Sequence, residues 1–480
     1  MALPAIDLMA LGAAGPEVAG DLGRLDQIAW LFVSYQLSLV VTVPLYGKLG
    51  DLRGRRTVYL SAVTVFTVAS LFAGLAWSFP VLLLARIAQG VGAGGVISQS
   101  TAVIADLVPA RERGRYSWVT PSVWTVASFA GPVLGGAIAE HAGWRWIFLI
   151  NLPLGVLAIW FVRDAFPERR DDEERSFDRL GATMLVVSYG ALVLALSMAS
   201  EAVGWSHPMV LGLLGLGFIT LAGFVRHEWS ANDPVMPLQL LRIPVVRASA
   251  ATTFLIGLVN FMAVAFLPLM LQVVLDLGTT QAGLAILPTT FMLAITSTIV
   301  GRTVARTGHY RVWPAAGSVV FAGGYAVLAG LGPSPSMIAV WIGTGLLGVG
   351  MGAGTPVFVL SMQNAVGHRD LGAVSAMSMF MRNTGQVFGT ALAGTWFAVR
   401  LSHHLDRLVV AGRLDGVRDE DLRGDIDVIR GLDADVEALV REAFRLAATD
   451  TFRIGFWVAL ASVVVAVTIP QLPLRESLDE

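Results

Sequence analysis

Two charged residues lie inside stretches that are otherwise apolar: Asp7 near the start of the chain and Arg86 in the run 83–94. A charge in lipid is costly, so such residues usually serve a function. Arg86 shares one helix face with Gly90 and Gly94, which follow it at four and eight residues, so its guanidinium lies beside a smooth groove. A lone carboxylate in apolar surroundings is neutral, and a nearby guanidinium favours its charged form. Such a pair is able to exchange a proton for a cationic or neutral substrate.

A second group of charges lies in the glycine-rich basic turn 47–56, GKLGDLRGRR. Gly47 and Gly54 stand seven residues apart, and Asp51 lies between them. The four cations around this acid are Lys48, Arg53, Arg55 and Arg56. A loop that only meets a membrane surface needs positive charge, but it needs neither the paired glycines nor the acid. The pattern therefore favours a specific contact over a simple juxtamembrane loop.

The elements that must position these charges are membrane-spanning helices. Mean hydropathy is +0.69, 55% of residues are hydrophobic and 14% are charged, whereas a soluble domain carries about a quarter charged residues. Period-2 alternation is absent, and backbone groups in lipid must bond internally, so we expect an all-α polytopic membrane protein. The fourteen expected spans, each of roughly twenty residues, are 1–18, 28–46, 57–77, 80–105, 117–139, 145–163, 180–200, 208–226, 248–274, 281–301, 313–332, 336–362, 373–399 and 452–472.

The distribution of basic residues predicts the orientation in the membrane. Lys and Arg together number 33, and Lys48 is the only Lys. With the N-terminus inside, the short inner loops hold most of these residues, while the short outer loops hold Arg24 and Arg145. This asymmetry places both termini in the cytoplasm, in a protein of the cytoplasmic (inner) membrane. The chain has no cysteine, which excludes disulfides and Cys-based metal sites.

The order of the spans divides the chain into groups of six, two and six. The expected domains are an N-terminal six-helix bundle (1–165), cytoplasmic linkers with two extra spans (166–246) and a C-terminal six-helix bundle (247–480). Within the last of these, we expect an outer loop over 400–453. Apolar residues at helical spacing over 436–446 predict a short amphipathic helix in that loop.

An internal repeat supports this division. Gly301 and Gly308 have the same spacing as the two glycines of the basic turn, and Ala305 stands where the acid would be. Both segments follow the second span of a six-span half. Two related halves that rock against each other around a mid-membrane site are typical of secondary transporters.

The first expected span is short. Residues 1–18 reach only ~27 Å across a hydrocarbon core of ~30 Å. Either the natural chain starts upstream of Met1 or this span is stunted, and we favour the first explanation.

Several segments resemble motifs of the major facilitator superfamily. The turn 47–56 is similar to that family's loop between spans 2 and 3, G-x-x-x-D-x-x-G-R-R/K, and residues 86–92 match its span-4 pattern, R-x-x-Q-G-x-G. The phrase W-R-W-x-F-x-I-N-x-P at 144–153 looks like the start of span 6 in the fourteen-span drug:proton antiporter family. The residues that resemble the antiporter motif of span 5, G-x-x-x-G-P-x-x-G-G, are Gly131, Pro132, Gly135 and Gly136, with Ala127 in place of the first glycine. The resemblance implies the major facilitator fold, with two six-helix bundles plus two extra central helices.

The resemblance also implies roles for the two buried charges. Asp7 falls on the acid of the family's span-1 motif, L-D-x-T-x-x-x-x-A-L-P. Three residues depart from that motif, namely Ile6, Met9 and Gly15. In the family, the Arg at the position of Arg86 lines the cavity and takes part in proton coupling. The two charges lie roughly 15 Å and 9 Å below the predicted outer ends of their spans, and therefore at similar depth.

A latch between the two halves is implied for the basic turn. In the family, the loop acid and its Arg partner hold the N-terminus of a C-half helix in the outward-facing state, which is physically reasonable because helix N-termini attract anions. Here the acid would meet the start of span 13 near 371–373, with Arg55 as its ion-pair partner. The latch residues are Gly47, Asp51, Gly54, Arg55 and Arg56.

Polar residues inside other spans are candidates for lining a cavity. They are Tyr35, Gln36, Gln89, Gln99, Asn260, Gln272, Arg382 and Gln386. Each also fits an interhelical hydrogen bond, which is the commoner role of such residues.

Two other classes of function are disfavoured. An ATP-driven pump needs a loop of the type G-x-x-x-x-G-K-[ST], but Leu49 follows the only Lys, Lys48. A membrane-embedded enzyme needs a reactive cluster, and the chain has no H-E-x-x-H motif. We therefore expect no enzymatic activity.

The expected function is proton-coupled secondary transport by alternating access, exporting amphipathic small molecules or drugs, as in multidrug efflux and antibiotic resistance. The proton gradient supplies the energy, and no cofactor or metal is expected. The expected partners are a hydrophobic or cationic small molecule, protons and the lipid bilayer, without nucleic acid, for a monomer. The alternatives are a transporter of the same fold that moves a lipid or metabolite, by export or symport, and a non-transporting sensor.

Overall fold

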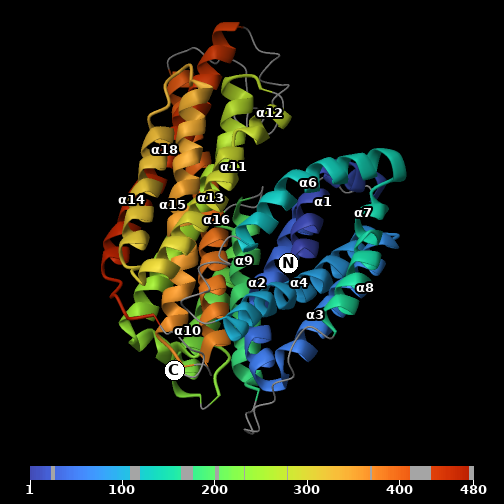
Figure 1. The fold of residues 1–480 in the computed structure, drawn as a ribbon. Helices are drawn as coiled ribbons and strands as arrows, with labels where there is room; N and C mark the ends of the chain where they lie inside the picture. The colour runs from blue at the N-terminus through green and yellow to red at the C-terminus, as the bar shows by residue number, and fades with distance from the viewer. Residues whose placement is uncertain are drawn as a thin grey trace.

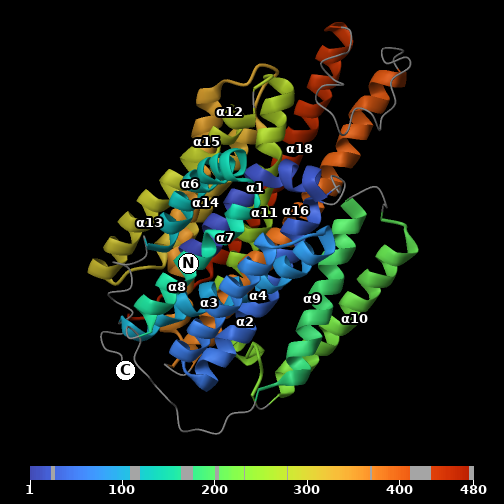
Figure 2. The ribbon, with the colours of Figure 1, turned by 90° about the vertical axis from the view of Figure 1, so that its right-hand side faces the viewer.

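The computed structural model describes residues 1–22, 28–108, 119–163, 177–200, 205–231, 233–277, 279–367, 370–410 and 434–474. These residues form helices and short connections, and they include no strand. Figure 1 shows two groups of helices side by side, one from the first part of the chain and one from the last. Figure 2 shows a hairpin of two further helices beside them.

The N-terminal bundle consists of α1 (Ala2–Leu22), α2 (Ile28–Arg53), α3 (Arg55–Gly74), α4 (Phe79–Leu107), α6 (Val119–Ala142), α7 (Arg145–Leu149) and α8 (Asn151–Val162). In this bundle α4 packs against both α2 and α3, and α1 packs against α6. The basic turn is shorter than the sequence suggests, because Gly54 alone separates α2 from α3. Its φ of 82° is a left-handed conformation that glycine adopts without strain.

The hairpin and the link that follows it consist of α9 (Arg179–Ser200), α10 (Pro208–Ser230) and the 3-10 helix η3 (Leu238–Arg242). The two helices pack against each other, and α9 also contacts α2. Glu228, which is fully buried, accepts hydrogen bonds from the backbone N–H groups of Val235 at 3.3 Å and Met236 at 3.0 Å. These bonds fix the chain where it leaves the hairpin for the second bundle.

The C-terminal bundle consists of α11 (Pro244–Val274), α12 (Thr279–Leu284), α13 (Leu287–Thr307), α14 (Val312–Ala329), α15 (Met337–Asn364), α16 (Leu371–Val410) and α18 (Ala434–Val467). Glycines allow its helices to approach closely. Gly385 lies against the backbone carbonyl of Phe254, and Gly389 lies against that of Leu258, so α16 and α11 meet backbone to backbone. In the same way, Gly350 brings α15 against Gly317 of α14.

The outer surface of the helices suits a lipid environment. Ten helices of the described chain are long and apolar enough to cross a membrane. Large apolar side chains point away from the molecule, among them Trp160, Phe161 and Ile219, which are 65%, 66% and 74% exposed. In water such a surface would drive association, whereas lipid tails accept it. The chain is therefore a multi-pass membrane protein with an all-helical fold.

The segment 400–453 differs from the expected loop. Helix α16 continues to Val410, and α18 already begins at Ala434, so both ends of this segment are helical. The short amphipathic helix expected over 436–446 is instead the first part of a helix of 34 residues. Residues 411–433 lie outside the described part.

Side-chain contacts explain why both helices continue beyond the expected spans. The rings of Phe397 on α16 and Phe444 on α18 pack edge to face, with centroids 6.0 Å apart. Further along, Asp450 accepts hydrogen bonds from Arg400 Nε at 2.6 Å and from His404 Nε2 at 3.2 Å. The apolar spacing was visible in the sequence, but its ionic partners on another helix were not.

Candidate functional site

Asp7 and Arg86 form a buried ion pair. Arg86 NH1 lies 2.6 Å from Asp7 Oδ2, and the two residues are 0% and 1% exposed, respectively. Asp7 is on α1 and Arg86 is on α4, so the pair connects helices that are distant in sequence. The two charges that the sequence places at similar depth thus meet in the structure.

Amide side chains complete the surroundings of the carboxylate. Asn151 of α8 donates its Nδ2 to Asp7 Oδ1 at 2.7 Å, and Gln89 of α4 donates its Nε2 to the same oxygen at 3.3 Å. Gln89 Nε2 also donates to Ser70 Oγ of α3 at 2.8 Å, and Gln89 Oε1 accepts from Arg86 NH1 at 2.9 Å. Both carboxylate oxygens therefore receive hydrogen-bond donors.

Asn151 and Ser70 were not among the candidates chosen from the sequence. Asn151 stands in the phrase that resembles the start of span 6, and it is a polar residue in a strongly apolar run. That placement is the signal that could have identified it. Ser70 carries no such signal, because a serine in a span bonds its own helix without strain, as Ser70 Oγ does with the Phe66 carbonyl at 2.8 Å.

Aromatic rings and backbone enclose the guanidinium. Its carbon lies 4.2 Å from the ring centroid of Tyr35 and 5.8 Å from that of Phe148, both favourable for cation–π attraction. Arg86 Nε donates to the Leu31 carbonyl at 3.3 Å. Gly90 lies against the backbone carbonyl of Tyr35, so the smooth groove beside Arg86 is filled by α2. Tyr35 therefore supports the guanidinium in this arrangement.

Protonation of Asp7 would break the ion pair with Arg86. A proton on the carboxylate removes the negative partner and leaves Arg86 as an unpaired charge inside the protein. Removing one partner of a buried ion pair typically costs about 3–5 kcal/mol. Loss of the negative charge on Asp7 would therefore destabilise the packing of α1, α4 and α8 around the pair.

The two halves of the molecule meet at the basic turn. Arg55 NH2 lies 2.9 Å from Asp51 Oδ1, and both side chains are largely buried. A Cβ atom added at Gly372, the second residue of α16, would lie 2.6 Å from Asp51 Oδ1 and 2.9 Å from Arg55 NH1. A Cβ added at Gly47 would lie 2.8 Å from Ala376 Cβ, one turn further along α16. Both glycines are thus required for this contact between α2 and α16.

Apolar side chains seal the junction at this end of the molecule. Val40 and Val43 of α2 belong to one buried cluster with Met362, Leu371 and Val374 of the C-terminal half. Lys48 of α2 also lies 3.8 Å from Asp233, in the link that leads to the second half. The structure is therefore closed on the side that the charge pattern predicts to be cytoplasmic.

The residues of the antiporter motif pack one helix against another. Gly131 of α6 lies against Met9, and a Cβ at Gly135 would lie 2.7 Å from the Cα of Ala10. These glycines let α6 approach α1 next to the segment that carries Asp7. Gly136 has no atom within 4 Å of such a Cβ, so it has no packing role here. Helix α6 runs through Pro132 without a break.

The other candidates lie on several helices. Gln99 donates to the backbone carbonyl of Tyr46, which makes it a link between α4 and α2. The remaining candidates are partly buried on three helices: Gln36 on α2, Asn260 and Gln272 on α11, and Arg382 and Gln386 on α16. Arg56, the last candidate of the latch, is the second residue of α3.

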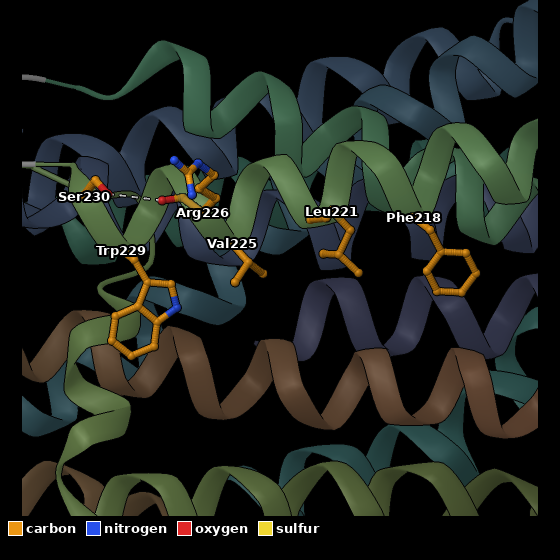
Figure 3. Close-up of a pocket in the computed structure, with 7 residues that line it drawn as sticks. Phe218, Leu221, Val225, Arg226, Trp229 and Ser230 are labelled. Atoms are coloured by element: carbon orange, nitrogen blue, oxygen red, sulfur yellow. Dashed lines mark hydrogen bonds between the residues drawn. The ribbon is translucent and has the colours of Figure 1, made fainter.

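A shallow depression on the surface lies away from these residues. Its lining comes from one helix, α10, and consists of Phe218, Leu221, Ala222, Val225, Arg226, Trp229 and Ser230. Figure 3 shows these side chains in a row along α10. Because its lining is mostly apolar and belongs to a helix of the exposed hairpin, the depression suits lipid contact.

The sequence is similar to those of known membrane transporters. A model of the Major Facilitator Superfamily matches residues 2–390. The chain is 32% identical to the multidrug transporter protein MdtP of Bacillus subtilis, over 85% of this chain and 76% of the relative. It is 28% identical to the multidrug resistance protein fnx1 of Schizosaccharomyces pombe, over 99% of this chain and 92% of the relative. It is also 32% identical to the efflux pump LUC4 of a Fusarium species, over 85% of this chain and 73% of the relative.

Solved structures show the same fold. The human organic anion transporter MFSD10 aligns with a TM-score of 0.57 at 15% identity, covering 95% of this chain and 97% of that chain. The proton:xylose symporter XylE aligns with a TM-score of 0.56 at 13% identity, covering 93% and 92%. At these identities the likeness concerns the arrangement of helices and not the cargo.

Proposed function

The chain belongs to the major facilitator superfamily, and we propose that within it the protein is a proton-coupled secondary transporter that exports amphipathic small molecules by alternating access. Members of this family move small molecules across membranes, so the protein is a transporter and not an enzyme. Its relatives at about 30% identity include multidrug transporters and efflux pumps. Export of drugs, and hence antibiotic resistance, is the activity that these relatives suggest.

The observation that carries the proposal is the buried pair of Asp7 and Arg86. A carboxylate enclosed by one guanidinium and two amides can hold a single proton or a single negative charge. Protonation of Asp7 leaves Arg86 unpaired. The protonated and ionised forms of this carboxyl group therefore favour different packings of the helices. This is the property that a proton-coupled carrier needs, and the proton gradient is then its only energy source.

Alternating access is supported by the contacts between the halves. The pair of Asp51 and Arg55 lies against the N-terminus of α16, where the positive end of the helix dipole favours the carboxylate. Together with the apolar cluster beside it, this contact keeps one end closed. We propose that the closed end is cytoplasmic and that the latch opens in the inward-facing state.

We further propose fourteen spans, as in the drug:proton antiporter family. Ten helices meet the length and hydropathy expected of spans. Four others contain at least 21 residues each, namely α1, α6, α11 and α16. With α9 and α10 as the extra pair, six spans precede the hairpin and six follow it, which places both termini on one side, the cytoplasmic face of the inner membrane.

The test is proton release from everted membrane vesicles. Vesicles acidified by respiration and loaded with a pH-sensitive dye receive a panel of cationic, neutral and anionic amphipathic compounds. Transport in exchange for protons relieves the quenching of the dye. We expect this response with the wild-type protein and its loss in Asp7→Asn and Arg86→Ala.

A matched control is available on the same helix. Asp21 also pairs with an arginine, Arg145, at 2.7 Å, but both side chains are about half exposed. Asp21→Asn should therefore keep the proton-release response, because water can solvate Arg145 when its carboxylate partner is removed. Equal responses of wild type and Asp7→Asn to every compound would refute proton coupling at this pair.

The second candidate function is transport of a lipid or a metabolite by the same fold, through export or symport. The proton:xylose symporter among the structural neighbours shows that the fold alone does not fix the cargo or the direction. Proton release in response to lipids or metabolites, with none from drug-like compounds, would favour this candidate.

A further inference from the structure

Arg382 is a charged side chain without a partner in the second half of the molecule. It lies eleven residues into α16, which is roughly 16 Å along the helix axis. Its Nε is enclosed and has no hydrogen-bond partner. Among the residues that the structure describes, none forms a hydrogen bond or ion pair with this guanidinium, although the residue remains partly accessible.

The sequence provides no acid to neutralise it. Between Asp233 and Asp406 the chain has two acidic residues, Asp276 and Asp370. The first lies after the end of α11, beside Arg441 at 3.9 Å, and the second lies before the start of α16. Helices α11, α12, α13, α14 and α15 therefore carry no carboxylate, and the buried Asp450 of α18 is paired with Arg400, His404 and Arg453. In the first half, the carboxylate of Asp7 is already occupied by Arg86, and no carboxylate among the described residues pairs with Arg382.

Arg382 lies on α16 between the side that meets the first half and the side that meets α11. Met379, Arg382 and Gln386 follow one another at three and four residues, so they share one side of the helix. The Met379 sulfur accepts a hydrogen bond from Thr101 Oγ1 of α4 at 3.5 Å, which fixes the direction of that side. Figure 1 shows α16 at the junction of the two groups of helices.

The helix cannot turn to hide this charge. The backbone carbonyl of Arg382 lies against Gly257 of α11, where no Cβ atom would fit, and the glycines at 385 and 389 continue this close packing. The rotation of α16 around Arg382 is thus fixed by its packing on α11. An unpaired arginine at such depth is expensive and is kept where it binds something.

We propose that Arg382 binds the anionic group of an amphipathic substrate, such as a carboxylate or sulfonate, at the boundary between the two halves. The inference rests on the proposed transport function and names the substrate class of that transporter. The planar guanidinium offers paired donors that match such groups, and Met379 one turn away offers an adaptable apolar contact. The proposal favours an anionic over a cationic cargo, because a cation would be repelled by the guanidinium.

The experiment measures equilibrium binding of three dansyl compounds to the full-length protein in nanodiscs of zwitterionic lipid. The compounds share one fluorophore and differ in charge: the anionic dansyl sulfonate, the neutral dansylamide and a dansylamide with a quaternary ammonium group. Arg382→Gln removes the charge, and Arg382→Lys keeps it. Binding to empty nanodiscs is subtracted.

We expect Arg382→Gln to weaken binding of the sulfonate by roughly tenfold or more, since hydrogen bonds to charged groups contribute that much. Binding of dansylamide should stay within about twofold in the same variant, and Arg382→Lys should retain most of the sulfonate affinity. Retained dansylamide binding also shows that the variant is folded. Equal weakening for all three compounds, or no change for the sulfonate, would overturn the proposal.

Two further measurements identify the source of the anionic group and test the transport function separately from the site. If phosphatidylglycerol competes with the sulfonate in wild type and not in Arg382→Gln, the anionic amphipath is a lipid, and the assignment of Arg382 stands. Proton-coupled efflux of dansylamide from vesicles tests the transport function independently of Arg382. Efflux without charge-dependent binding would refute the site alone, whereas charge-dependent binding without efflux of any compound would refute the transport function alone.

Discussion

Replacing Gly372 by alanine should open the contact between the basic turn and α16. The added Cβ would lie 2.6 Å from Asp51 Oδ1 and 2.9 Å from both Asp51 Oδ2 and Arg55 NH1. Ordinary contact begins near 3.5 Å, so the ion pair must move by most of an ångström. Overpacking of this kind costs about 1–3 kcal/mol. The cost falls only on the closed state, so the equilibrium between closed and open states shifts by roughly 5- to 150-fold.

Because the chain has no cysteine, spin labels can be attached to introduced cysteines without first removing native ones, and the shift can be measured. Two exposed threonines, Thr57 at the start of α3 and Thr307 at the end of α13, lie near the turn and its counterpart in the repeat. Labels on Thr57→Cys and Thr307→Cys report the distance between the halves by pulsed electron resonance. We expect a longer-distance population to appear with Gly372→Ala and with Asp51→Asn.

A control on the same helix separates this effect from a general change in α16. Gly394 has no atom within 4 Å of an added Cβ, so Gly394→Ala should leave the distance distribution unchanged. Asp51→Asn should also abolish transport while the protein still inserts into the membrane. A distance distribution for Gly372→Ala identical to that of wild type would refute the latch.

Three other substitutions test the packing and the site. Asn151→Leu removes the 2.7 Å hydrogen bond to Asp7 and should lower proton-coupled transport about tenfold, measured in everted vesicles at equal expression; unchanged transport would contradict this role. Gly90→Ala places a Cβ atom against the backbone carbonyl of Tyr35 and should destabilise the protein by about 1–3 kcal/mol. Gly136→Ala has free space for its Cβ atom and should leave the stability unchanged. Thermal unfolding in detergent compares the two variants. Asp450→Asn should loosen the paired ends of α16 and α18, seen as faster hydrogen exchange there and not in α2.

The sequence predicts this molecule best where lipid raises the cost of a charge. Asp7 and Arg86 could be recognised because each is a charged residue in an otherwise apolar span, and their similar predicted depth in the membrane favours a contact between them. The glycines and the acid of the basic turn indicate a specific contact, but its place at the start of α16 is implied only by the resemblance of this turn to the family's loop motif. The structure shows the ion pair and its position against Gly372.

Other features depend on helix packing that one sequence does not reveal. Ser70 reaches the site only because α3 lies against α4, and a serine in a span has many other uses. Gln99 resembles Gln89 in type, yet it bonds a carbonyl of α2 and not the carboxylate. Helices α16 and α18 continue beyond the expected spans because Asp450 of α18 pairs with Arg400 and His404 of α16. The hydropathy of each segment alone does not predict this pairing.

The central claim, that Asp7 couples protons to transport, is tested most directly in proteoliposomes with an imposed pH gradient. The measurement compares accumulation of one transported compound against its gradient with its exchange at equilibrium, in wild type and in Asp7→Asn. We predict that the variant loses accumulation but retains exchange, because an amide resembles the protonated carboxyl and still permits the halves to move. Accumulation by Asp7→Asn equal to that of wild type would contradict the account.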